Sequence, residues 1–389
     1  MYELSDKEIF KLMVIVVNTR LLLKNRLEGI GWFTYETMKR ITREHPEHQF
    51  IFLFDRSYDH TFVFSDNVKP VRVLPPARLP LLWFFWFEFR VPAILKKYNA
   101  DLFLSTDGYL TTRSPVPQLP VMHDLNFMHR PRDLPLWISL YYNHFFPHFA
   151  RKAIRIATVS AYSKNDITAT FGIEPGKIDI VYSGYNQRYT PVSAPDQEKV
   201  RRRYTDGNRF FLYVGALHPR KNIEGLLRAF DDFRSRTGSP DKLVVVGGKM
   251  FKTGRIFRIF KRMKFRGEVV FTGRIPDEEL RLVLGSALAL VFVPFFEGFG
   301  LPLIEAMGAG VPVIASNTTS LPEVGGDAAL YADPESPRQI ARAMELISGD
   351  ETLRKRMIEK GILRKEMFTW DRTAALLWES VRKALEKQG

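Results

Sequence analysis

The sequence has no cysteine, and it contains no long apolar run. Without cysteine, disulfides, thiolate metal sites and thiol nucleophiles are excluded. No stretch of about 18 apolar residues occurs, so no membrane-spanning helix is expected. Acidic residues Glu3, Asp6 and Glu8 stand where an export signal would have its basic start, which predicts a cytoplasmic protein.

Acidic residues are scarce relative to basic ones. The chain has 43 Asp and Glu against 57 Lys and Arg, a formal net charge of +14. Such a charge favours anionic partners: nucleic acid, phosphorylated substrates or acidic lipid headgroups. Charge alone does not choose among these three.

Short apolar runs alternate with helix-like segments from end to end, which is typical of parallel sheets covered by helices on both faces. The predicted fold class is therefore α/β. At roughly 150 residues per domain, a chain of 389 residues suggests two domains. The expected strands are residues 12–17, 49–54, 101–106, 119–124 and 155–160 in the first half, and 210–215, 242–248, 268–273, 288–294 and 311–316 in the second.

The two sets of strands are separated by a stretch rich in Ser, Pro, Tyr and Asn without apolar periodicity. This predicts a first domain at 1–182, a linker at 183–206, a second domain at 207–370 and a last helical segment at 371–389. Ligands of open parallel sheets collect beyond the carboxyl ends of the strands. We therefore expect a cleft between the domains, lined by residues that follow strands.

Two glutamates follow an expected strand of the second half. Glu297 lies in a loop after Pro294, and Glu305 lies one turn into a helix that Pro302 suits at its start. Gly298 and Gly300 let backbone N–H groups approach a ligand closely, and the helix start favours an anion such as a diphosphate. Carboxylates accept hydrogen bonds from sugar hydroxyls, so we expect Glu305 to hold a ribose and Glu297 a transferred sugar. The alternative is that both are surface acids.

A basic pair, Arg220 and Lys221, follows the first strand of the second half. Cations at this position would stabilise a departing nucleoside diphosphate, whose negative charge grows as it leaves. Lys221 is the better candidate. A solvated pair at a helix start is the alternative, since exposed basic residues are common.

The first half offers two weaker signals. Gly29 and Gly31 precede a helix, which fits a phosphate-binding loop and a tight turn equally well. Their spacing is not the G-x-G-x-x-G of dinucleotide-binding folds, which disfavours that class. His123 and Asp124 end an expected strand on the cleft side, although an unselected histidine is most often structural.

The spacing of Glu297 and Glu305 resembles the E-x7-E motif of the retaining family 4 glycosyltransferases, which have the GT-B fold of two facing Rossmann-like domains. The resemblance covers nearly the whole chain. It continues in TVSAYSKNDI, VYSGYN, LPEVGGDAALYADPESP and a terminal FTW before a helix, in the family's order and spacing. It implies that the first domain binds the acceptor, the second binds the nucleotide-sugar, and the last helix crosses back to the first domain.

The resemblance also implies roles for individual residues. Glu297 would contact the donor sugar, Glu305 the ribose and Lys221 the phosphates. Many relatives carry an arginine where this chain has Ala216, so either Arg220 replaces that charge or one lysine suffices. Other residues that the resemblance places at the cleft are Gly298, Phe299, Gly300 and Leu301 near sugar and diphosphate, Arg274 near the base, Gly29 and Gly31 in a loop closing over the diphosphate, and His123 with Asp124 near the reacting carbon.

The expected reaction is transfer of a hexose with retention of configuration, from a nucleotide-sugar to a glycan or lipid-linked acceptor of a surface polysaccharide. GDP-mannose is the first guess for the donor, with UDP and dTDP sugars open. No Asp-x-Asp occurs, the spacing with which metal-dependent enzymes of nucleotide-sugars hold a divalent ion. We therefore expect no metal and no cofactor, with cations and the helix dipole stabilising the diphosphate.

Two rival functions remain open. A sugar-nucleotide epimerase of the same fold would turn over without an acceptor. A nucleic-acid-binding protein would suit the charge, but Glu297 and Glu305 would repel phosphate unless a sugar were held there, so nucleic acid is not an expected partner.

Two segments mix basic and aromatic residues. Residues 78–97 concentrate aromatics between basic flanks, and residues 249–266 contain eight Lys or Arg and no acid. A buried helix and a solvated basic face are the plain interpretations. The alternative is peripheral contact with an anionic membrane at its inner face, where a lipid-linked acceptor would be found.

Overall fold

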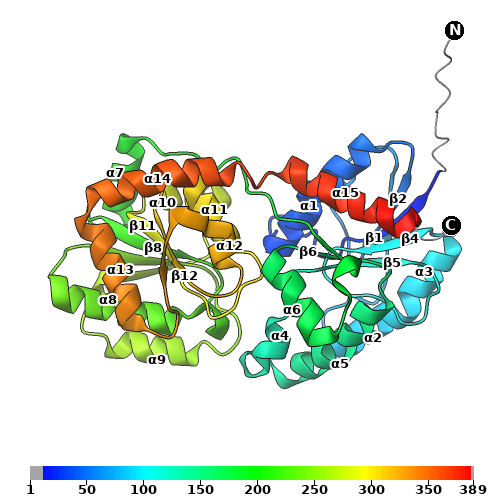
Figure 1. Cartoon of the computed structure of the whole chain (residues 1–389), viewed down its shortest axis with the longest axis horizontal. Coiled ribbons are helices and arrows are strands. Elements are labelled where there is room, and N and C mark those ends of the chain that lie inside the picture. The colour runs from blue at the N-terminus through cyan, green and yellow to red at the C-terminus, as the bar shows by residue number, and fades with distance from the viewer. Residues whose placement is uncertain (1–11, 387–389) are drawn as a thin grey trace, which may run out of the picture.

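The computed structural model describes residues 12–386, which form two parallel β-sheets side by side (Figure 1). The first sheet has seven strands in the order β3-β2-β1-β4-β5-β6-β7. The α/β fold class predicted from the alternation of apolar runs is confirmed. The strands are β1 Val14–Asn18, β2 Gln49–Phe54, β3 Val68–Arg72, β4 Leu102–Ser105, β5 Gln118–Met122, β6 Ile156–Thr158 and β7 Ile178–Ile180.

The central strands are apolar throughout because both of their faces are covered. In β1, Ile15 and Val17 belong to the core beneath α1 (Gly29–Glu44), whereas Val16 between them belongs to the core on the opposite face. Successive side chains of a strand point to opposite faces, so a strand covered twice needs apolar residues at every position.

The second sheet has six strands in the order β10-β9-β8-β11-β12-β13. In each sheet the chain first adds strands toward one edge and then toward the other. This reversal falls between β1 and β4 in the first sheet and between β8 and β11 in the second. Ligands of such sheets bind at these reversal points. The strands are β8 Phe210–Val214, β9 Lys242–Val246, β10 Val269–Gly273, β11 Ala289–Phe292, β12 Val313–Ser316 and β13 Ala329–Ala332.

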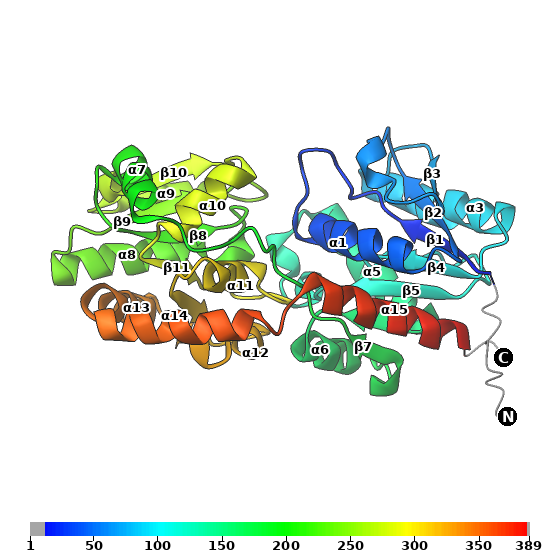
Figure 2. The same cartoon turned by 90° about the horizontal axis from the view of Figure 1, so that it is seen from above.

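Helices cover both faces of the first sheet. Helices α1 and α15 (Trp370–Glu386) lie together on one face (Figure 2). The opposite face carries α2 Pro80–Phe85, a π-helical turn at Trp86–Arg90, α3 Val91–Lys97 and α5 Leu136–Lys152. Shorter α4 Asn126–His129 precedes α5, and α6 Ala161–Phe171 lies between β6 and β7.

Helices α8 and α13 pack together in the second domain, as do α11 and α14. The helices of this half are α7 Ala194–Thr205, α8 Ile223–Thr237, α9 Gly254–Arg262, α10 Asp277–Gly285, α11 Leu301–Gly308, α12 Leu321–Gly325, α13 Pro337–Gly349 and α14 Glu351–Lys365.

The chain passes twice between the two halves. It leaves the first sheet after β7, and it returns between α14 and α15, which lies against α1. Within the segment expected to be a linker, residues 194–205 form helix α7, which packs on α10. Only Val200 and Thr205 of α7 are buried, so its sequence carries almost no apolar periodicity.

Ten strands were expected, and a strand is found at each place, with ends that differ by up to two residues. Three further strands were not predicted: β3, β7 and β13. Each of them lies at the edge of its sheet. An edge strand is covered less completely, so its apolar run is short and interrupted.

Candidate functional site

The reversal points of the two sheets face each other across the domain boundary. Residues after β8 and β11 meet residues after β5, and Arg220 of the second domain lies 3.4 Å from Asp124 of the first. The structure therefore brings together side chains that the sequence separates by almost a hundred positions or more. Charged groups from both halves meet at the place where the strand ends predicted a cleft.

The loop after β11, residues 293–300, carries Glu297, and we call it the glutamate loop. Two serines hold its backbone. The Ser316 hydroxyl donates to the Pro294 carbonyl (2.6 Å). The Ser320 hydroxyl contacts the carbonyls of Glu297 (2.9 Å) and Phe299 (3.1 Å). These bonds fix the backbone on both sides of the Glu297 side chain, and sequence reasoning did not identify either serine.

The turn that carries the basic pair is fixed by Asn222. Its side-chain amide donates to the carbonyls of Val293 (3.0 Å) and Pro334 (2.7 Å), and its oxygen caps α8 by accepting from the Gly225 N–H. The Phe295 N–H also donates to the Arg220 carbonyl (2.9 Å). The basic turn and the glutamate loop are therefore one hydrogen-bonded unit.

Four charged side chains meet at this unit. The Lys221 ammonium pairs with Glu297, and the Arg220 guanidinium lies 3.6 Å from Glu297 and 3.4 Å from Asp124. Each of the four is largely buried, with side-chain exposures of 12–21%. The cluster thus joins both predicted cations to two predicted acids.

Burial and charge act on these groups in opposite directions. Burial lowers the pKa of Lys221, and Glu297 opposes it. Burial raises the pKa of Asp124, but Arg220 and the bonds from Asn126 outweigh it and hold that pKa below its usual value. Asp124 is therefore a carboxylate at neutral pH, aimed at the cation nearest the cleft.

Glu305 lies in a different environment. Burial raises its pKa to about 8, and the nearby charge of Asp277 adds to the rise. No cation offsets this cost, in contrast to Glu297, which has two. A buried carboxyl group in this state gains most from hydroxyl donors, which favour its ionised form.

The glycines of the glutamate loop are required by space. A β-carbon on Gly298 would overlap the His123 carbonyl oxygen, so this residue presses against the first domain. Gly300 precedes α11 with φ of 106°, a conformation that favours glycine. The Phe299 side chain turns away, packing against Phe368 with ring centroids 5.5 Å apart.

The two glycines of the first domain differ. A β-carbon on Gly29 would lie 3.7 Å from a methyl group of Leu301, so Gly29 faces the start of α11 across the cleft. A β-carbon on Gly31 would instead meet the Leu21 carbonyl at 3.0 Å and the Leu27 side chain. Both glycines are thus part of the first turn of α1, so the expectation that they precede the helix is wrong. Gly31 lies where residues 21–27 pack closely against the start of α1, and of the two glycines it is Gly29 that faces the second domain.

His123 is held as a neutral ring. Its Nε2 lies 2.9 Å from the Thr106 carbonyl, which only accepts, so Nε2 carries the proton and Nδ1 is the acceptor of the ring. Burial lowers the pKa of His123, although the bond to Thr106 and the charges of Asp124 and Asp107 oppose this. Phe33 packs edge-on against the ring at 5.1 Å.

Arg274 lies apart from the charged cluster. Its side chain is 47% exposed and lies 3.7 Å from Glu28, at the start of α1. It therefore bridges the two domains beside the first turn of α1, which contains Gly29.

Helix α6 connects the first domain to the glutamate loop. The Ser160 hydroxyl donates to the Gly298 carbonyl (2.7 Å) and caps α6. The Glu323 carboxylate, from the second domain, accepts from the N–H groups of Ala161 (2.7 Å) and Tyr162 (2.9 Å). Both Ser160 and Glu323 lie in sequence stretches that carry the family resemblance, but their pairing across the cleft was not predicted.

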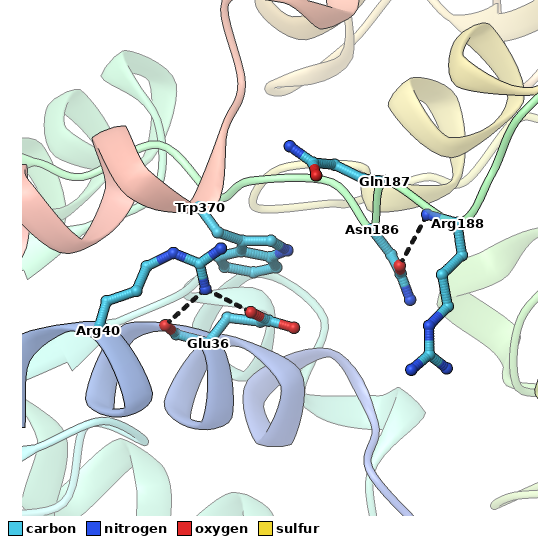
Figure 3. Close-up of a pocket in the computed structure, with 6 residues that line it drawn as sticks. All are labelled: Glu36, Arg40, Asn186, Gln187, Arg188 and Trp370. Atoms are coloured by element: carbon cyan, nitrogen blue, oxygen red, sulfur yellow. Dashed lines mark hydrogen bonds and ion pairs between the residues drawn. The ribbon is translucent and has the colours of Figure 1, made fainter. Parts of the chain in front are cut away.

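A pocket lies where the chain passes between the domains (Figure 3). Its walls come from α1, from the segment after β7 and from the start of α15. None of the predicted site residues lines it. The lining residues are Glu36, Arg40, Asn186, Gln187, Arg188 and Trp370.

Each half of the chain matches a described sequence family. Residues 27–188 match "Glycosyltransferase Family 4", and residues 196–364 match "Glycosyl transferases group 1". Among curated proteins, the chain is 28% identical over 360 residues to O-antigen chain mannosyltransferase B of Escherichia coli, covering 90% of this chain and 94% of that protein. It is 26% identical over 275 residues to the O-antigen chain mannosyltransferase RfbU of Salmonella typhimurium, covering 69% and 71%.

Solved structures share the fold at low identity. Sucrose-phosphate synthase from Thermosynechococcus elongatus superposes with a TM-score of 0.75 at 18% identity, covering 96% of this chain and all of that one. WaaG, a glycosyltransferase involved in lipopolysaccharide biosynthesis, gives 0.72 at 15% identity, covering 93% and 98%. The two parallel sheets and these matches together define a glycosyltransferase of the GT-B fold. Within that class, the chain belongs to glycosyltransferase family 4.

Proposed function

We propose that this enzyme transfers a mannosyl group, with retention of configuration and without a metal ion, from GDP-mannose to a glycan or lipid-linked acceptor. The observation that carries the proposal is the cluster of Lys221 and Arg220 with Glu297 beside the start of α11. The choice of mannose rests on the two O-antigen mannosyltransferases to which the chain is similar. An acceptor in surface polysaccharide synthesis follows from the same likeness.

In this proposal the donor diphosphate binds between the basic pair and the first turn of α11. Its oxygens compete with Glu297 for the Lys221 ammonium, which leaves the Glu297 carboxylate to accept hydrogen bonds from the transferred sugar. Both cations then face the charge that develops on the leaving diphosphate, where electrostatic stabilisation lowers the barrier most. Glu305 holds the ribose through its hydroxyls.

Retention is proposed to proceed on one face of the sugar. The leaving phosphate oxygen accepts the acceptor proton as the new bond forms on the side from which the diphosphate departs. His123 is neutral, with Nε2 donating to Thr106, so its Nδ1 accepts from a sugar hydroxyl near the reacting carbon and no covalent intermediate is required.

The test is transfer from GDP-, UDP- and dTDP-hexoses to an acceptor preparation with excess EDTA present, with the anomeric configuration of the product read by NMR. We expect GDP-mannose to be used, the product to keep the donor's configuration, and Lys221→Ala to reduce kcat about 10²–10³-fold. A parallel reaction without acceptor separates the epimerase alternative. Inverted product, or activity that returns only when magnesium or manganese is added back, would overturn the corresponding part of the proposal.

A further inference from the structure

Half of the large apolar side chains that are exposed within residues 12–386 lie on two neighbouring helical segments of the first domain. Trp137 is 74% exposed and Leu81 is 69% exposed, although apolar side chains of this size are normally buried. We call this set the apolar patch: Leu79 just before α2, Leu81 and Phe85 on α2, Phe89 on the following π-turn, and Leu136, Trp137 and Leu140 at the start of α5.

The two segments that carry the apolar patch pack against each other through aromatic side chains. Trp83 stacks on Tyr142 of α5 with ring centroids 5.7 Å apart, and Phe84 contacts Phe145 at 5.9 Å. Trp83 and Trp86 are buried and donate their indole N–H groups to backbone carbonyls. The sequence of segment 78–97 allowed a buried helix or an exposed apolar surface, and the structure shows one of each on opposite faces. One face packs in the core, and the other carries Leu81, Phe85 and Phe89 at intervals of four and points to solvent.

Positive charge surrounds the patch. Arg78 and Arg90 are exposed, and Arg113 lies over the Phe89 ring at 4.2 Å. The acidic residues within 78–97 and 130–152 are Glu88 and Asp133. Glu88 is buried and accepts from the Thr112 N–H and hydroxyl, and Asp133 pairs with Arg130 at 2.7 Å.

A second basic surface borders the same side of the molecule. The Lys252 ammonium, just before α9, donates to the Arg132 carbonyl in the turn before α5. Helices α9 and α5 both lie along the lower edge of Figure 1. Phe257 and Phe260 of α9 pack on Phe271 of their own domain, so this helix offers exposed basic residues rather than apolar ones. The basic residues of segment 249–266 are all exposed: Lys249, Lys252, Arg255, Arg258, Lys261, Arg262, Lys264 and Arg266.

We propose that the apolar patch docks on an anionic lipid bilayer, with Trp137 and the exposed leucines and phenylalanines at the headgroup boundary and the surrounding arginines on acidic headgroups. Among residues 12–386, no helix is both long and apolar enough to cross a bilayer. An apolar surface with a basic border is the pattern of interfacial binding, and neither element alone gives stable attachment.

Charge distinguishes a bilayer from a second copy of this chain. A symmetric dimer through the patch would place the arginines of one copy against those of the other, which is unfavourable. An acidic bilayer complements both parts of the surface. The surface also adjoins the cleft, because Arg130, six residues after Asp124, stacks on Phe295 of the glutamate loop at 4.5 Å. Docking would thus hold the opening of the site beside the lipid surface.

The experiment is sedimentation of the full-length protein with vesicles of phosphatidylcholine alone or mixed with phosphatidylglycerol, at low and high salt. We expect binding to the acidic vesicles at low salt and its loss at high salt. Arg90→Gln should weaken binding about fivefold, and Leu81→Gln with Trp137→Gln about tenfold or more. The matched controls are Leu363→Gln and Lys355→Gln on α14, exposed by 75% and 71%, which should bind as the unchanged protein does.

The proposal would be overturned by no binding to acidic vesicles, by equal loss in the control variants, or by a dimer in solution that the patch variants convert to monomer. Substitutions in α9 that abolish binding while patch variants retain it would move the contact to the second domain and also contradict it. The measurement is independent of sugar transfer. Patch variants should keep their turnover with a water-soluble acceptor, so failure of docking and failure of the proposed reaction are distinguishable.

Discussion

At the scale of single residues, the two glutamates of the E-x7-E motif differ in what surrounds them. Glu297 lies between two cations, whereas burial without a cation raises the pKa of Glu305 to about 8. The same residue type therefore has two different charge environments, and this follows from position alone. Glu305 suits a ligand that supplies hydroxyl donors. Glu297 suits a ligand whose anionic groups compete for the Lys221 ammonium.

This difference predicts a proton release when donor binds. The pKa of free Glu305 is raised, so the group is mostly protonated at pH 7, and ribose hydroxyls that donate to the carboxylate lower its pKa in the complex. Affinity for GDP-mannose should therefore rise with pH up to about 8 and then level off. Calorimetry at pH 7 in two buffers of different ionisation enthalpy should show close to one proton released.

Two variants identify the group responsible. Glu305→Gln cannot ionise, so its affinity should be lower and independent of pH. Glu297→Ala should keep the pH dependence while transfer slows, because that carboxylate is assigned to the sugar. Proton uptake by the unchanged protein, or release that persists in Glu305→Gln, would contradict the assignment.

Gly298 gives a second prediction at this scale. Gly298→Ala puts a β-carbon into the His123 carbonyl oxygen, so the loop must move away from the first domain. A displacement of about 1 Å near reacting groups can cost about a hundredfold in kcat, and we expect a loss of that order. Gly349→Ala is the control, since a β-carbon there meets nothing within 4 Å. Turnover of Gly298→Ala equal to that of the control would show that the contact does not matter.

The sequence predicted which charged residues belong to the candidate site, but it did not predict which groups they contact. Strand ends and glycines singled out Glu297, Glu305 and Lys221, because a residue after a parallel strand has a known place in the fold. The roles of Ser160 and Glu323 could not be predicted from the sequence. Each side chain bonds to backbone groups across the domain boundary, and such a contact leaves no local sequence pattern. Arg220 was expected near the diphosphate as the weaker member of the basic pair and as a possible substitute for the arginine absent at Ala216. Its contact with Asp124 required the structure.

At the scale of elements, α6 and α12 form a clasp between the domains. The Glu323 carboxylate accepts two backbone N–H groups at the start of α6, where the helix dipole also favours negative charge. Next to it, Ser160 holds the carbonyl of Gly298. Closure of the domains and the shape of the glutamate loop are thus set by the same helix end.

The clasp predicts that Glu323→Ala opens the molecule. Hydrogen bonds to a charged group contribute about 1.5–3 kcal/mol each, so their loss shifts the balance toward separated domains. We expect a larger radius of gyration by small-angle X-ray scattering and a raised KM for the donor, with less effect on kcat at saturation. Glu335→Ala, an exposed glutamate of the same domain, is the control. An unchanged radius and unchanged KM would rule out the clasp as a determinant of closure.

Strands and helices that are mostly buried were easier to predict from the sequence than those that are mostly exposed. Central strands such as β1 and β11 read as continuous apolar runs because helices cover both faces. The edge strand β3, with the sequence VKPVR, contains a lysine and a proline, which an edge position tolerates and which remove the signal. Helix α7 was assigned to a linker for the same reason: ten of its twelve residues are not buried, so no apolar face marks it.

At the scale of the whole molecule, the site exists only where the two domains meet. The cations come from the second domain, while His123 and Asp124 come from the first, and hydrogen bonds join the two across the cleft. Neither half contains the complete constellation. An acceptor bound to the first domain can meet a donor bound to the second only in the closed arrangement.

The first domain is also incomplete until the end of the chain. Helix α15 lies on α1 and against β5 and β6, and it buries Leu377 and Val381. During synthesis the first sheet leaves the ribosome long before this cover, and at about 5–20 residues per second the delay between Tyr182 and Trp370 is roughly 10–40 s. During that time the apolar surface of α1, β5 and β6 that α15 later covers is exposed. A nascent chain stalled in the second domain would therefore present a surface that chaperones recognise.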